Sequence, residues 1–438
     1  MTYQDQQTQC LRSELELFSL PPLQLAVEDG QWVEYNPVSS ITSGAPIEFV
    51  VTGGSEEYID LSKTLIEVKA VIKELSGEIA PKTKHIAPVN NTLHSLFSQV
   101  DVSLNDVPVS SSTTTYPYRA YIENHLNYGS DAKDSRLSAG LYCIDNNITQ
   151  SDPIPDDENA VVNTGLAFRH RVCTGQSFDM IGGIHADIFH QSRYLINGVT
   201  LSMRMMRSKD KFVLMGSGDH TMEIISAKLW VRKLKITPSL VLAHEKMLAK
   251  QTAKYPLTRV EVKVFHLPSG QKSFTHEGLY MGQLPKRIVI GIVDNRAFNG
   301  DLSLNPYEFK HCDLNFLSLH MDGQQIPWAP LKPSYATDNY IRAFFTQFSS
   351  GDGINTDTGN TIDREEFKLG NTLYCFDLTP DLSSSSAHHF NIIKRGNLRV
   401  EMAFEHVLPF TGNVIVYSEF ESVIEIDNAR KVTHDYAG

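Results

Sequence analysis

The chain of 438 residues has little cysteine, and its cysteines follow no pairing pattern. The five cysteines are an odd number, and no two of them form a C-x-x-C pair. A disulfide framework and a zinc knuckle are therefore both disfavoured, and thiols in a reducing compartment are expected. No apolar run approaches the roughly 18 residues of a membrane span, so none is predicted. Residues 1–7 are polar and lack the apolar region of a signal peptide.

Positive charge is also scarce. The chain has 51 acidic and 39 basic residues and a net charge of −12. Such a surface is poorly suited to neutralising phosphates, so we predict no sequence-specific nucleic-acid partner. Tyr116, Tyr118 and Tyr121 could stack on bases, but a place in a barrel core or a subunit contact is favoured. One basic cluster fits alternation along a strand, with its members on a solvated face: Lys228, Arg232, Lys233 and Lys235.

The motifs of common catalytic sites are missing as well. The sequence contains neither a G-x-S-x-G elbow nor a G-x-x-x-x-G-K-[ST] phosphate loop. His244-Glu245 begins like a zinc-protease helix, but Leu248 stands where the second histidine is needed. His388 and His389 are adjacent and would point to opposite faces of a strand, which favours a loop or turn role. Four other candidates are scattered without the spacing of a site: His266, His276, Glu277 and His311.

An acidic loop is the remaining candidate for a metal site. Asp352, Asp357 and Asp363 lie among glycine and asparagine and could bind calcium through oxygen ligands, although a solvated loop is favoured. We therefore predict no catalytic, cofactor-binding or metal site, and no enzymatic activity.

What the sequence does contain is alternation of apolar and polar residues with a period of two. Residues 47–51, 65–73, 96–104 and 260–265 show it, and Gly53-Gly54 marks a turn. The apolar run 287–293 fits a strand buried on both faces. Many short strands joined by long irregular segments predict an all-β protein built of antiparallel sandwiches or barrels.

The second half of the chain also resembles the first. Three pairs of segments match in the same order: 102–131 with 317–352, 198–205 with 396–403, and 222–231 with 414–423. This internal repeat predicts two similar β domains in tandem.

The predicted division of the chain follows from this repeat. It comprises an N-terminal arm (1–30), a first β domain (31–237), a connecting helix and linker (238–255), a second β domain (256–427) and a C-terminal tail (428–438). Pro238 fits the first turn of the connecting helix. The arm could pack on a neighbouring subunit or on its own domain. Two long inserts at matching points of the repeat, 127–165 and 349–363, are predicted to project from the same end.

Several segments resemble the capsid proteins of Maverick/Polinton elements and adintoviruses. The most specific are 94–102 and 116–123, and others are 17–22, 31–35, 282–289 and 305–310. The resemblance covers roughly residues 13–430. It implies a double jelly-roll major capsid protein (a hexon), with two tandem eight-stranded jelly rolls, a short connecting helix and long loops.

The resemblance further implies a homotrimer whose six barrels form a pseudo-hexagonal tile of an icosahedral capsid. Its partners would be neighbouring trimers, the penton and other minor capsid proteins. Its place would be the virion, after synthesis in the host cytoplasm and assembly there or in the nucleus. Two alternatives are a minor or penton capsid protein and a carbohydrate-binding or hydrolytic β-sandwich protein. The length and the internal repeat favour the major capsid protein.

Overall fold

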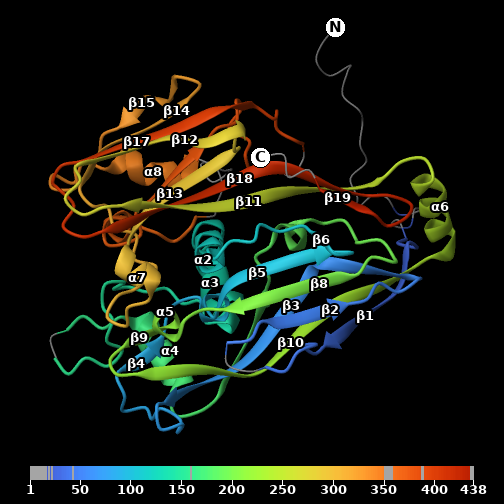
Figure 1. Cartoon of the computed structure of the whole chain (residues 1–438), viewed down its shortest axis with the longest axis horizontal. Helices are drawn as coiled ribbons and strands as arrows, with labels where there is room; N and C mark the ends of the chain where they lie inside the picture. The colour runs from blue at the N-terminus through green and yellow to red at the C-terminus, as the bar shows by residue number, and fades with distance from the viewer. Residues whose placement is uncertain are drawn as a thin grey trace.

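The computed structural model describes residues 17, 20, 23–41, 44–157, 160–349, 359–385 and 389–434. Two β-rich units lie side by side, and the chain passes between them through a helix at one end, α6 (Pro238–Leu248) (Figure 1). Strands make up 42% of the chain and helices 18%, which confirms the all-β prediction. Among the described helices, none has the length and apolar character needed to cross a membrane.

The N-terminal unit contains two four-stranded antiparallel sheets. Their strand orders are β1-β10-β3-β7 and β2-β8-β5-β6. Strands that are distant in sequence are neighbours in both sheets, as in a jelly roll. The strands are β1 (Val27–Tyr35), β2 (Ile47–Val51), β3 (Glu57–Glu74), β5 (Phe97–Leu104), β6 (Val107–Pro108), β7 (Phe178–Gly183), β8 (Leu201–Arg207) and β10 (His220–Ile236).

The C-terminal unit repeats the same topology. Its sheets have the orders β11-β18-β13-β16, with β19 added beside β18, and β12-β17-β14-β15. The correspondence is strand for strand, which confirms the prediction of two eight-stranded jelly rolls. The strands are β11 (Ala253–Leu267), β12 (Ser273–Gln283), β13 (Arg287–Asp294), β14 (Leu314–Met321), β15 (Gln324–Leu331), β16 (Leu373–Asp377), β17 (Arg395–Phe404), β18 (Gly412–Ile426) and β19 (Val432–His434).

The three sequence matches fall on equivalent strands of the two units, namely β5 and β14, β8 and β17, and β10 and β18. The equivalence extends to a tight turn. Asn105 and Asp106 have φ of 46° and 64° between β5 and β6, and Asp322 and Gly323 have φ of 49° and 83° between β14 and β15. Two positive φ values are typical of the two-residue hairpin turn whose twist suits the flanking strands.

The same hydrogen bonds hold both turns. The side chain of Asn105 accepts from the backbone N–H of Thr200 at 2.8 Å, and that of Asp322 accepts from the N–H of Asn397, also at 2.8 Å. Thr200 and Asn397 occupy equivalent positions near the start of β8 and β17. Each turn is therefore fastened to the adjacent strand by a side-chain acceptor at its first position.

Strand β13 is buried on both faces, as the apolar run 287–293 predicted. Ile288 and Ile290 point into the core of the C-terminal unit, whereas Val289 and Val293 join the core of the N-terminal unit. Strand β18 alternates in the same way, with Val416 in one core and Ile415 in the other. The apolar core is consequently continuous across the boundary between the two units, which we call the junction.

Helices and short strands complete the structure. Strand β1 begins at Val27 and β11 at Ala253, and the domain limits given above stay a prediction. The remaining elements are β4 (Ile86–Pro88), which pairs with β9 (Leu214–Gly216), α1 (Thr92–Ser95), α2 (Tyr116–Asn127), α3 (Ser130–Asp134), η3 (Arg136–Gly140), α4 (Thr164–Cys173), η4 (Asp187–His190), α5 (Asp210–Val213), α7 (Asn295–Asn299), α8 (Ile341–Ser349) and α9 (Arg364–Lys368).

Candidate functional site

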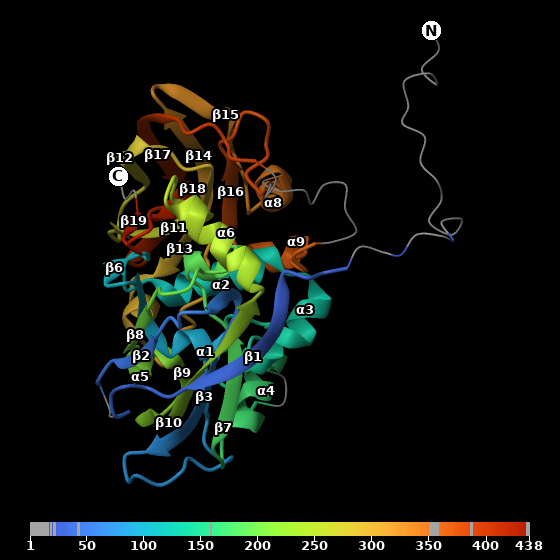
Figure 2. The ribbon, with the colours of Figure 1, turned by 90° about the vertical axis from the view of Figure 1, so that its right-hand side faces the viewer.

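Helix α2 is the central element of the junction. Figures 1 and 2 both place it between the two units. All of its residues from Tyr116 to His125 are buried. A helix that is covered on every side belongs in an interior rather than on a surface. Pro117 lies in the first turn, where a missing N–H costs nothing.

Buried charges on α2 connect the two units. Arg119 Nε donates to Glu123 Oε1 at 2.9 Å, one helical turn away, and Arg119 Nη2 lies 2.7 Å from Asp187 Oδ1. Asp187 also accepts from the backbone N–H of Val260 on β11 at 3.2 Å. Tyr417 on β18 donates to Glu123 Oε1 at 3.3 Å. Two carboxyl groups of the N-terminal unit therefore contact two strands of the C-terminal unit.

The two carboxylates respond differently to this environment. Burial opposes the ionisation of Glu123, but Arg119 and a hydrogen bond from His185 outweigh it and hold the pKa of Glu123 far below its ordinary value. Burial dominates at Asp187 and raises its pKa although Arg119 acts against it. Arg119 is thus the only cation in direct contact with both carboxylates among the contacts described, and both depend on it.

Aromatic rings fill the rest of the junction. The rings of Tyr121 and Tyr307 stack with their centroids 4.1 Å apart and an angle of 2° between their planes. Tyr118 stacks on Phe298 with centroids 5.4 Å apart. The hydroxyls of Ser95 and Tyr307 are 2.5 Å apart. Tyr118 and Tyr121 therefore pack between the two units, and together with Tyr116 they belong to the buried apolar core, as the sequence favoured.

The two long inserts meet through a buried lysine. Lys133 Nζ donates to the backbone oxygens of His125 at 2.8 Å and Asn360 at 2.5 Å, and to Thr361 Oγ1 at 2.9 Å. Burial lowers the pKa of Lys133 to about 8. Much of the first insert is packed into the molecule, because Leu141 and its neighbours are buried. Residues 350–358 of the second insert lie outside the described residues.

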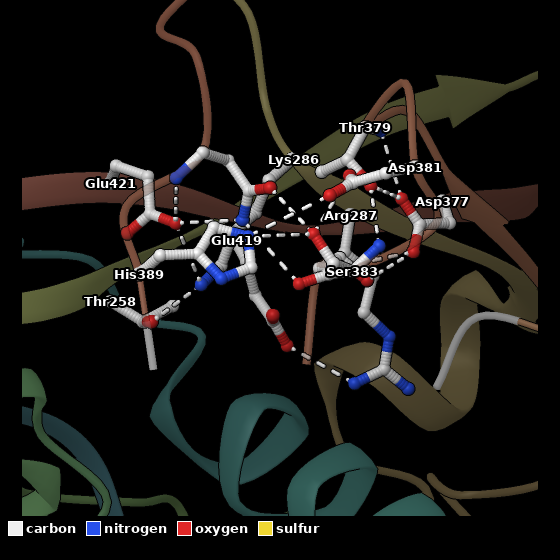
Figure 3. A network of polar contacts seen from close by, with 12 residues as sticks. Thr258, Lys286, Arg287, Asp377, Thr379, Asp381, Ser383, His389, Glu419 and Glu421 are labelled. Carbon is white, nitrogen blue, oxygen red and sulfur yellow. Dashed lines mark hydrogen bonds and ion pairs between the residues drawn. The ribbon is translucent and has the colours of Figure 1, made fainter. Parts of the chain in front are cut away.

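A second polar network lies on the C-terminal unit near the junction (Figure 3). Lys286 Nζ donates to Thr258 Oγ1 at 2.9 Å and lies 3.4 Å from Glu421 Oε1. The same carboxylate oxygen accepts from Asn391 Nδ2 at 3.0 Å, and Asn391 Oδ1 accepts from Ser383 Oγ at 2.9 Å. These contacts attach the segment between β16 and β17 to β18.

The histidine candidates from the sequence take part in separate contacts. His244 on α6 lies 2.9 Å from Tyr58 OH, and Glu245 forms an ion pair with Arg430 at 2.5 Å. His389 Nε2 is 3.7 Å from Asp381 Oδ2. His244 and Glu245, which form the zinc-protease pattern in the sequence, therefore join α6 to Tyr58 and Arg430.

The other candidates are also dispersed. The His276 ring lies 4.2 Å from that of Phe265, and Glu277 pairs with Arg399 at 3.1 Å. His311 stacks on Tyr335 with centroids 4.1 Å apart, whereas His266 is exposed on β11. His388, Asp352 and Asp357 lie outside the described residues. Asp363 caps α9 by accepting from the backbone N–H of Glu366 at 2.8 Å.

The basic cluster on β10 is largely paired with carboxylates of the flanking strands. Lys228 lies 3.1 Å from Glu34 on β1, and Lys233 lies 2.9 Å from Glu57 on β3. These pairs reduce the positive charge available to a phosphate.

Sequence reasoning missed the charged centre of the junction. Arg119 and Glu123 stand four residues apart inside an aromatic block, which is the spacing of a helical ion pair. That spacing was a usable signal for an internal helix. Asp187 and His185 gave no comparable signal, because their partners are more than 60 residues away in sequence.

Comparisons with known proteins agree with this architecture. No family model matches the chain. An uncharacterized protein of Caenorhabditis elegans is 24% identical over 426 residues, covering 94% of this chain and 98% of that protein. A chain of the cryo-EM structure of the Sputnik virophage is similar with a TM-score of 0.64 and 12% identity, over 98% of this chain and 94% of that one.

Two solved capsid proteins are similar as well. The Faustovirus major capsid protein has a TM-score of 0.58 and 9% identity, over 97% of this chain and 94% of that one. The mavirus major capsid protein has a TM-score of 0.51 and 12% identity, over 98% of this chain and 96% of that one. The chain has a double jelly-roll fold. The buried contacts of α2 hold the two halves of this double jelly roll together.

Proposed function

We propose that the chain is the major capsid protein of a virus or virus-like element of the Maverick/Polinton and adintovirus type. One observation carries the proposal: two jelly rolls of identical strand order stand side by side in one chain and share a continuous core. A repeated unit in this arrangement supplies two corners of a six-cornered tile, so three chains complete it. The similarity to solved capsid proteins over nearly the whole chain supports the same function.

The junction suits this role because a tile requires the two barrels to keep a fixed relative orientation. A linker alone would let them move independently. The contact of Glu123 with Tyr417 and the stacked rings of Tyr121 and Tyr307 fix their orientation instead. We propose that each chain enters assembly as a preformed, rigid pair of barrels.

Contacts between subunits require surface that is apolar in the separate chain. Phe390, Ile392 and Ile393 stand exposed on one segment before β17, with 46%, 76% and 58% of their surface accessible. Exposed apolar groups that are this close together mark interaction sites. We propose this segment as part of the contact inside the trimer. A closed trimer repeats one heterologous contact three times.

The oligomeric state of purified protein tests the function. We expect size-exclusion chromatography with light scattering to give a mass near three times 49.1 kDa. Electron microscopy should show hexagonal tiles or closed shells. The double variant Ile392→Ser with Ile393→Ser should be monomeric and folded, with Leu242→Ser on α6 as the control that stays trimeric. A wild-type monomer at high concentration would contradict the proposal.

Placement in the virion, in contact with neighbouring trimers and with penton and other minor capsid proteins, follows from the same proposal. The two inserts after the equivalent helices α2 and α8 are proposed to lie at one end of the trimer. Deleting residues 351–358 should leave the trimer intact if that end is its outer surface.

A further inference from the structure

A histidine-rich cluster borders the charged centre of the junction. Glu123 on α2 and His185 and His190 in the segment before β8 each direct one side-chain ligand atom to a common point. These three atoms all lie within 4.8 Å of one another. Around a tetrahedral zinc ion with bonds of about 2.0–2.1 Å, ligand atoms are spaced by roughly 3.3 Å. Small side-chain rotations therefore bring the three atoms to coordinating distance.

The outer contacts of these residues orient them toward that point. Glu123 Oε1 is engaged by Arg119 Nε at 2.9 Å and Tyr417 OH at 3.3 Å, which directs Oε2 toward His185 Nδ1, 2.5 Å away. Ligands of protein-bound metals are oriented by outer hydrogen bonds of this kind.

Charge and access also suit a cation. The single positive charge of Arg119 faces two carboxylate side chains, those of Glu123 and Asp187. His190 is exposed, whereas Glu123 and His185 are buried. The exposed side of His190 gives an ion an entry path and leaves room for a water as fourth ligand.

We propose that Glu123, His185 and His190 bind one divalent transition-metal ion of the zinc class. Two imidazoles and one carboxylate are a donor set for such ions, whereas calcium and magnesium prefer oxygen ligands. The bound ion joins α2 to the segment before β8 beside Arg119, whose partners Glu123 and Asp187 contact the C-terminal unit. Metal occupancy therefore adjusts the stability of the junction, because an ion that binds only the folded chain stabilises it.

Calorimetric titration of the full-length protein, stripped with chelator, tests the site with zinc chloride at neutral pH. We expect one tight site per chain and a zinc-dependent rise in Tm, with neither effect from calcium. His190→Ala should weaken this tight site by about 100-fold or more. That variant retains the Arg119 ion pairs, so it should still fold. His266→Ala removes an exposed histidine on β11 and should bind zinc as the wild type does.

Each outcome decides the proposal. Stoichiometric binding by the wild type and by His266→Ala, with loss in His190→Ala, establishes the site. No tight site in the wild type, or equal affinity in His190→Ala, overturns it and leaves the Glu123–His185 contact as a buried hydrogen bond only. A tight site lost only in His266→Ala overturns it as well, by locating the metal elsewhere.

Discussion

Single residues at the junction act through charges that are shielded from water. Arg119 faces Glu123 and Asp187, and its side chain is only 7% accessible. Bringing an ion pair out of water is costly, so such a pair does not by itself imply high stability. Removing one partner is a different matter, because the remaining charge is then buried without compensation.

Replacement of Arg119 by methionine should therefore lower the free energy of unfolding by about 3–5 kcal/mol. The control is Arg204→Met on β8, whose pairing with Glu48 is at the surface, with about half of each side chain accessible. That change should cost less than about 1 kcal/mol. Urea denaturation of both variants measures the difference. Equal losses of unfolding free energy in the two variants would show that the buried ion pair contributes no more to stability than the exposed one.

Lys133 gives the junction a pH dependence in the alkaline range. The pKa of Lys133 is about 8 in the folded chain, whereas its ordinary value is 10.5. Between these two pH values the lysine is protonated in the unfolded chain and largely deprotonated in the folded chain. The free energy of unfolding accordingly rises with pH between about 8 and 10.5 because of Lys133. The free energy of unfolding of the wild type relative to Lys133→Met should increase by about 2 kcal/mol from pH 7.5 to 9.5. If the difference in unfolding free energy between the two proteins did not change with pH, the lowered pKa of Lys133 would be contradicted.

Among the elements, β13 shows how closely the two units are packed. Gly291 lies on this doubly buried strand, and a Cβ added there would come within 2.5 Å of Phe309 Cδ1 and 2.8 Å of Leu373 Cδ2. Glycine suits this position because the side chains of Phe309 and Leu373 pack directly against it. Packing at this point leaves no room for a methyl group.

Gly291→Ala should consequently destabilise the protein by about 1–3 kcal/mol. Gly183→Ala on β7 is the matched control, since a Cβ there meets nothing within 4 Å. The control should change stability by no more than about 0.5 kcal/mol. Thermal unfolding of the two variants provides the comparison, and a neutral Gly291→Ala would show that β13 and Phe309 can separate at little cost.

At the scale of the whole molecule, the net charge of −12 matters for assembly. The proposed trimers would carry charge of the same sign and should repel one another, and salt shortens the range of that repulsion from roughly 30 Å at 0.01 M to 3 Å at 1 M. Assembly of trimers into larger shells should therefore increase with ionic strength, as followed by light scattering. The trimer itself should persist, because its contacts are proposed to be apolar. If the extent of assembly did not change between low and high ionic strength, charge would be excluded as its regulator.

The sequence by itself determined the strands and their repetition. Alternation with a period of two is a local property, so β2, the turn after β5 and the doubly buried β13 could be read directly. The repeated order of three segments was sufficient to indicate tandem β domains. The resemblance to known capsid proteins added the jelly-roll topology.

Only the tertiary structure decided how the two domains join. The contacts of Glu123 with His185 and Tyr417 span 62 and 294 residues of sequence. No local pattern encodes such partners, because they are selected by the packing of whole sheets against α2. The charged centre and the proposed metal ligands therefore emerged from the fold, which brings together residues that are far apart in sequence.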